Sequence, residues 1–247
     1  MQTHHTLTIP NTESEAYYTA RYHYLLQIIF SETIAIDYCK TMATFAPNKA
    51  ASVFLLQQQS EEELHLDMLT EYVGNNPRPH VLISPYLKKL DATMKDAIER
   101  KDYIECIFIQ NFIVEGLNIS LLRELEHHTD STLSELCSKI LQNEIGHMEF
   151  GISEVRRILE EDTSIVIRKR LIKLQRITLF YSTGLAMTLA LEAKDLGIPM
   201  KEFAENVLKE HLDRIAQVNF PLPFLDTILF KGMILFLKLF VTLRHQK

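Results

Sequence analysis

The sequence predicts an all-α protein, and three observations support this. Glycine and proline, which interrupt helices, supply only 7 and 8 of the 247 residues, about half of their usual share. Apolar residues recur at helical spacing through long uninterrupted segments, for example at Leu25, Ile28 and Ile29. No segment alternates between apolar and polar residues with the period of two that is typical of a strand. The composition also excludes collagen-like and low-complexity chains.

Residues that start or end helices divide the chain into a series of predicted helices. Thr12 and Glu15 form a capping box before the first helix, which ends at Pro47. Asn48 is a typical N-cap of the second helix, and Gly74 is a typical residue just after its end. Residues 1–12 are polar and are expected to be loose. The predicted helices cover residues 13–46, 49–74, 84–101, 102–127, 131–160, 165–196, 200–218 and 224–244.

Length, charge and cysteine content limit the class of protein. One domain over residues 1–247 is expected, because a chain of this length can bury one large core. The net charge of −6 disfavours nucleic-acid binding, which usually needs a basic excess. Cys39, Cys106 and Cys137 contain no C-x-x-C pair and give no disulfide framework. No secretory segment follows Met1, so a cytoplasmic location is expected.

The last predicted helix, residues 224–244, is apolar and long enough to span a bilayer. Asp226, Lys231 and Lys238 argue against a span, because each charge near a helix centre costs ~2.5–3.5 kcal/mol on an insertion scale. Two interpretations stay open: an additional core helix, and a helix in peripheral contact with a membrane surface.

Glutamate and histidine residues on four predicted helices form a candidate metal site. Two E-x-x-H elements occur, and residues three apart share one helix face, so each element aims a carboxylate and an imidazole at one point. Two more glutamates lie among the apolar residues of two other helices, where a carboxylate is costly unless it is paired or binds a metal. The candidate ligands are Glu32, Glu62, His65, Glu115, Glu144 and His147.

Spacing about the turns places these glutamates at matching heights. Glu32 and Glu62 each lie 15 residues from Pro47, whereas Glu115 and Glu144 lie 15 and 14 residues from Asp130. In an antiparallel hairpin, equal distances from the turn bring side chains together, here ~20 Å from the hairpin end. Between the two hairpins the separation is longer, at 53 residues from Glu62 to Glu115. Two matched hairpins and a long crossover predict a ferritin-like four-helix bundle with additional C-terminal helices, and that class uses this ligand set.

Four carboxylates and two imidazoles suit two iron ions, with a mixed Mn/Fe pair or two manganese ions as alternatives. Glu62 and Glu144 are expected to bridge the two ions, although the pattern alone does not separate bridging from terminal ligands. Glu61 and Glu63 compete with Glu62 for the ligand role. In the second E-x-x-H element the residue four before His147 is Asn143, which has no carboxylate, so Glu144, three before it, is the candidate ligand there. If the two elements bind metal in the same way, the corresponding ligand in the first element is Glu62.

Three polar residues near the candidate ligands are candidates for hydrogen bonds to them: Gln110, Asn111 and Asn143. For Gln110 and Asn111, simple hydrogen bonding between helices is an equal alternative.

Part of this pattern resembles a known family. The segment Ile107–Glu115, the E-x-x-H elements and the turn Asp195–Ile198 are similar to those of cyanobacterial aldehyde-deformylating oxygenases, in order over residues 15–220. More broadly the chain resembles the ferritin-like di-iron carboxylate proteins. The resemblance implies that the six candidate residues are metal ligands and that a di-iron centre activates O₂ beside a hydrophobic substrate site. The chain departs from the wider class, which often has arginine before the histidine, at Leu64 and Gly146.

The leading functional hypothesis is a di-iron, O₂-activating oxygenase or oxidase that acts on an apolar small molecule such as a long-chain aldehyde or acyl chain. It would also use an external electron donor. The additional C-terminal helices favour this hypothesis, because iron storage needs no such additions. The alternatives are a dimanganese catalase, a ferritin-type iron-handling protein, and a scaffold that has lost its metal.

Overall fold

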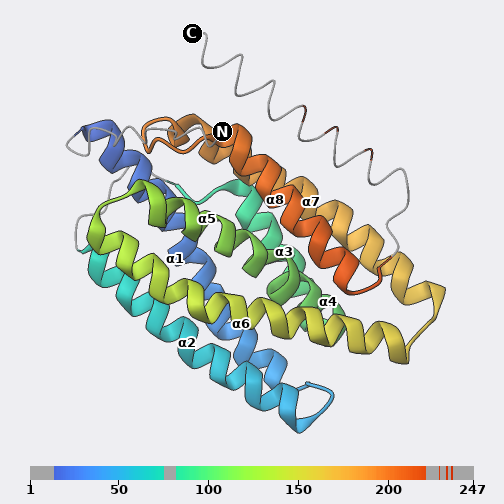
Figure 1. The fold of residues 1–247 in the computed structure, drawn as a ribbon. Helices are drawn as coiled ribbons and strands as arrows, with labels where there is room; N and C mark the ends of the chain where they lie inside the picture. The colour runs from blue at the N-terminus through green and yellow to red at the C-terminus, as the bar shows by residue number, and fades with distance from the viewer. Residues whose placement is uncertain (1–13, 75–81, 221–227, 229–231, 233–234, 236–247) are drawn as a thin grey trace, which may run out of the picture.

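The computed structural model describes residues 14–74, 82–220, 228, 232 and 235, and every regular element among them is a helix (Figure 1). This confirms the all-α prediction. The predicted loose segment 1–12 and most of the predicted helix 224–244 lie outside the described residues. In chain order the elements are α1 (Glu15–Ala43), α2 (Lys49–Val73), α3 (Pro85–Glu99), α4 (Tyr103–Ile107), η1 (Phe108–Val114), α5 (Glu115–His128), α6 (Ser131–Glu161), α7 (Ile165–Ala193) and α8 (Met200–Gln217).

Most helix ends fall within a few residues of the predicted boundaries, because the capping residues act as expected. The Asn48 side chain accepts the Ala51 N–H at 2.9 Å, and Gly74 adopts a φ of 64°, which favours glycine. The start of α1 differs from the prediction. Its N-cap is Ser14, whose hydroxyl accepts the Tyr17 N–H at 3.0 Å.

Two antiparallel hairpins form the four-helix bundle, α1 with α2 and α5 with α6, and α2 also contacts α6 (Figure 1). The connection between the hairpins runs through α3, α4 and η1. This is the arrangement that the residue spacing predicted. Outside the bundle, α7 packs against α3 and α8 packs against α5.

The segment Tyr103–His128 is the one helix, within the described part of the chain, that is long and apolar enough to cross a membrane. Its most apolar window is 94% buried inside the fold, as expected of a central helix in a bundle.

A π-helical segment interrupts this central helix just before Glu115. The sequence predicted one continuous helix over residues 102–127, but η1 separates α4 from α5, and the Glu115 N–H bonds to the Gln110 carbonyl five residues earlier. π-helical turns of this kind are frequent at functional sites. Helix α6 approaches η1 closely, since a Cβ on Gly151 would lie 2.7 Å from the Asn111 carbonyl oxygen.

Candidate metal centre

The structure brings all six predicted ligands together inside the bundle. Each is at most 1% exposed. Apolar side chains fill the bundle on both sides of them along its axis, including Leu25, Leu69 and Leu125 on one side and Met42 and Leu55 on the other. The six candidate ligands are Glu32 from α1, Glu62 and His65 from α2, Glu115 from α5, and Glu144 and His147 from α6.

Their side chains form two groups, each suited to one metal ion. In one group, Glu32, Glu62, His65 and Glu144 offer atoms that lie within 4.8 Å of one another. In the other, Glu62, Glu115, Glu144 and His147 do the same. The two groups share Glu62 and Glu144, which are the carboxylates of the two E-x-x-H elements. If two ions bind, the carboxylates of Glu62 and Glu144 are the ones placed to contact both.

Both imidazoles direct the Nδ1 atom into the cluster. Nδ1 of His65 lies 3.3 Å from Glu32 Oε2, 3.3 Å from Glu62 Oε2 and 3.4 Å from Glu144 Oε1. Nδ1 of His147 lies 3.4 Å from Glu62 Oε1 and 3.5 Å from Glu144 Oε2. Each imidazole therefore faces both of the shared carboxylates.

The donor set fits a pair of divalent cations. Several buried atoms of the cluster have no hydrogen-bond partner: Glu32 Oε1, Glu115 Oε2, both oxygens of Glu144, and His147 Nδ1. Buried polar atoms without partners are costly, and carboxylates in a dry interior need a compensating charge. Four carboxylates with two neutral imidazoles carry the charge that two divalent cations neutralise.

The cluster holds its protons unevenly. The pKa values of Glu32, Glu115 and His65 are raised, whereas the two imidazoles outweigh burial at Glu144 and lower its pKa. Burial, followed by repulsion from Glu62 and Glu144, raises the pKa of Glu32 well above its ordinary value. Burial opposes the charged form of His65, but the three carboxylates that face it, those of Glu144, Glu32 and Glu62, raise its pKa to about 12. Protons and a metal ion compete for the same lone pairs, so metal binding at this site must release protons.

Amide side chains fix the carboxylates of Glu62 and Glu115. Gln58 is fully buried and donates from Nε2 to Glu62 Oε1 at 3.0 Å and to Glu115 Oε1 at 2.9 Å. Gln110 also donates to Glu115 Oε1, at 2.9 Å. Asn111 donates to Gln58 Oε1 at 2.7 Å and lies 3.4 Å from the His147 carbonyl oxygen.

Of these amides, sequence reasoning missed Gln58, although it precedes Glu62 by four residues and therefore shares its helix face. Gln110 reaches Glu115 because the π-helical segment brings residues five apart into register. In an α-helix, at ~100° per residue, they would point in different directions.

Glu61 acts from outside the cluster. Its Oε2 lies 2.7 Å from Nε2 of His147, so the imidazole N–H donates outward and leaves Nδ1 free to bind a metal. Asn143, expected to hydrogen-bond to a ligand, instead bonds to Glu61 and acts one step further from the cluster. Glu63 is exposed and accepts from Gln59 at 2.9 Å. Of the three glutamates considered for the ligand role, Glu62 therefore lies inside the cluster, Glu61 contacts the outer side of His147, and Glu63 is exposed to solvent.

The two histidines differ in their outer contacts. Nε2 of His65 is buried and, within the described residues, has no hydrogen-bond partner, whereas Nε2 of His147 has Glu61. Leu64, where the wider di-iron class often carries arginine, is 57% exposed and supplies no polar group.

No protein-family model matches the sequence, and no curated protein matches it. A solved structure does. It is described as "Protein 19 with aldehyde deformylating oxidase activity from Synechococcus" and aligns with a TM-score of 0.71 at 16% sequence identity, over 90% of this chain and 97% of that one. The chain has the fold of that Synechococcus protein.

The alignment confirms the fold class and, at the level of fold, the predicted resemblance to aldehyde-deformylating oxygenases. At 16% identity the likeness concerns the fold alone, so the chemistry has to be argued from the residues of this chain.

Proposed function

We propose that this protein is a di-iron, O₂-activating oxygenase or oxidase that acts on an apolar small molecule such as a long-chain aldehyde or acyl chain. One observation carries the proposal: two groups of four buried ligand residues share the carboxylates of Glu62 and Glu144. A paired site of this kind with carboxylate and imidazole donors suits two iron ions. When bound, such ions supply O₂ activation.

The side chains around the ligands prepare this site. Gln58 and Gln110 hold the Glu115 carboxylate through one of its oxygens and leave the other for a metal ion. Glu61 sets the orientation and tautomer of His147. The apolar side chains at both ends of the site exclude water, which strengthens electrostatic interactions inside it.

An apolar substrate is consistent with the walls beside the site. A small cavity between α1, α3 and α5 is lined mainly by apolar side chains such as Ile28, Leu87 and Leu117, together with the amides of Gln27 and Asn118. It also reaches Ser31 and Val114, the residues that precede Glu32 and Glu115. Its volume of about 10 Å³ leaves room for one water at most, so a substrate here must displace the apolar side chains. O₂ and an external electron donor are the other partners of the proposed reaction.

Anaerobic loading with Fe(II), followed by O₂, a chemical reductant and a series of aldehydes and fatty acids, tests the proposal. Gas chromatography would detect the products and an oxygen electrode the O₂ consumed. O₂ uptake that depends on the organic substrate and is lost in Glu144→Ala supports the proposal. Hydrogen peroxide breakdown by a manganese-loaded protein, without organic turnover, would instead support a dimanganese catalase.

A further inference from the structure

Helix α7 concentrates positive charge in a protein that is acidic overall. Between Ile165 and Leu191 it contains five basic residues and no acidic residue, whereas the net charge of the whole chain is −6. One of the five, Arg170, is paired with carboxylates at the start of α4. Lys169 and Lys173 are exposed, and neither forms an ion pair with a described residue. This part of the surface therefore attracts anions although the protein as a whole repels them.

Basic and apolar side chains share one exposed face of α7. Intervals of three, four, three and four residues separate five exposed residues: Val166, Lys169, Lys173, Arg176 and Phe180. This spacing places all five on one side of an α-helix. Val166 is 62% exposed and Phe180 is 58% exposed. The face extends over 14 residues, which corresponds to ~21 Å along the helix axis.

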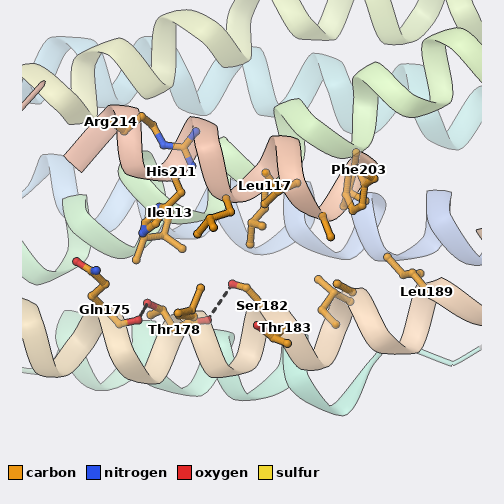
Figure 2. A pocket seen from close by; sticks show the side chains of 17 residues that line it. Ile113, Leu117, Gln175, Thr178, Ser182, Thr183, Leu189, Phe203, His211 and Arg214 are labelled. Atoms are coloured by element: carbon orange, nitrogen blue, oxygen red, sulfur yellow. Dashed lines mark hydrogen bonds between the residues drawn. The ribbon is translucent and has the colours of Figure 1, made fainter. Parts of the chain in front are cut away.

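The opposite face of α7 points into the molecule. Figure 2 shows Thr178 and Ser182 on the side of α7 that faces α8, where both line a cavity. Phe180 lies two residues from each of them, and residues two apart point ~200° apart on an α-helix. Phe180 therefore points away from α8. Because α7 lies outside the four-helix bundle (Figure 1), its outer face is open to solvent among the described residues.

Aromatic residues extend this face at the Phe180 end. The ring of Tyr86 on α3 meets the Phe180 ring edge-on, with centroids 6.4 Å apart, and the Tyr181 centroid lies 5.9 Å from that of Phe180. Lys89 Nζ lies 5.6 Å from the centroid of the Tyr86 ring and 5.7 Å from that of Tyr181. Tyrosine and lysine each join an apolar body to a polar tip, which suits the boundary between lipid headgroups and hydrocarbon.

The combination of charge and apolar surface favours a lipid membrane as the partner. Anionic headgroups match Lys169 and Lys173, and the hydrocarbon beneath them can receive Val166 and Phe180. A nucleic acid would match the charges, but its phosphate backbone offers no apolar layer for Val166 and Phe180. A face that follows one straight helix also fits a planar surface.

We propose that the outer face of α7, with the adjoining aromatic residues of α3, docks on an anionic lipid membrane with α7 parallel to the bilayer. The sequence placed a possible membrane contact on the predicted helix 224–244, most of which lies outside the described residues. The contact on α7 is a different surface. It goes beyond the proposed oxygenase function and does not depend on it, because vesicle binding can be measured with or without metal.

Co-sedimentation of the full chain with vesicles tests the proposal. One set of vesicles is phosphatidylcholine alone, and the other is an equal mixture of phosphatidylcholine and phosphatidylglycerol. Each basic residue near an anionic surface strengthens binding about fivefold, so Lys169, Lys173 and Arg176 predict a preference of about 100-fold for the anionic vesicles. The preference should fall in high salt, which screens surface charges.

Charge variants locate the contact. Lys169→Glu/Lys173→Glu should weaken binding to the anionic vesicles by about 25-fold or more. Lys49→Glu/Lys139→Glu, which makes the same change in net charge at exposed positions of α2 and α6, is the matched control and should leave binding nearly unchanged. Equal binding by these two variants would overturn the proposal and move the contact to another surface, such as the predicted helix 224–244.

A valine pair tests the apolar part of the face. Val166→Asp should weaken vesicle binding about tenfold, whereas Val53→Asp, at a valine of α2 that is 54% exposed, should not. Heparin, a polyanion without hydrocarbon, is the competing probe. Heparin binding as tight as vesicle binding, with no effect of Val166→Asp, would identify a site for charge alone and contradict the proposal. No binding to anionic vesicles, or equal binding to both kinds, would also overturn it, and these two results need only the unmodified protein.

Discussion

Replacing Glu61 by glutamine removes the charge that holds His147 from outside the metal site. The carboxylate lies 2.7 Å from His147 Nε2, and its side chain is 24% exposed. A hydrogen bond to a charged group contributes about 1.5–3 kcal/mol, and partial exposure favours the lower part of that range. Because the glutamine oxygen still accepts the N–H, we expect Glu61→Gln to weaken metal binding about tenfold, and Glu61→Ala up to about a hundredfold.

The loss should be confined to one of the two metal ions, because Glu61 contacts His147 and His147 belongs to only one of the two groups of candidate ligands. Anaerobic Fe(II) titration against a chelator resolves the two binding steps. Glu63→Gln, which changes an exposed neighbour, is the matched control and should alter neither step. Equal weakening of both steps, or no difference between Glu61→Gln and Glu63→Gln, would refute the role assigned to Glu61.

Three further predictions concern the packing, the hydrogen bonds and the protons of the site. Gly151→Ala should lower the free energy of unfolding by about 1–3 kcal/mol, because the new Cβ would lie 2.6 Å from Asn111 Cβ. Gly146→Ala is the matched control: no atom lies within 4 Å of its Cβ, so it should raise the free energy of unfolding by up to about 1 kcal/mol. Urea unfolding measures both. Gln58→Leu removes a donor from both Glu62 and Glu115 and should lower the free energy of unfolding by about 1–3 kcal/mol, and an unchanged urea midpoint would contradict this. Metal affinity should rise with pH, because a bound cation displaces protons from His65, Glu32 and Glu115, whose pKa values are raised. Calorimetry in buffers of different ionisation enthalpy would count the released protons. A metal affinity that does not change with pH would contradict the assignment of these residues as ligands.

The bundle and its ligand set could be predicted from the sequence because both depend on local rules. Capping residues such as Asn48 fix helix ends, and equal distances of Glu32 and Glu62 from Pro47 fix their height. The repeated E-x-x-H element also singled out Glu62 and Glu144, the two residues that both groups share, although the pattern alone does not separate bridging from terminal ligands. These features need no knowledge of tertiary packing.

The π-helical segment and the contacts behind the ligands could not be predicted in the same way. Phe108–Val114 is buried throughout, and its sequence carries no signal for a change of register; the close approach of Asn111 to Gly151 of α6 is a tertiary contact. Glu61 and Glu63 flank Glu62 symmetrically in the sequence, and only the position of His147 on α6 distinguishes their roles.

Metal content of the untagged protein, purified from cells supplied with both iron and manganese, tests the central claim most directly. Mass spectrometry should find close to two irons per chain, and this should fall sharply in Glu115→Ala but not in Glu63→Gln. Two manganese ions per chain would favour the catalase alternative. Little metal in the unmodified protein, even after anaerobic loading with Fe(II), would contradict the assignment of the six buried residues as ligands.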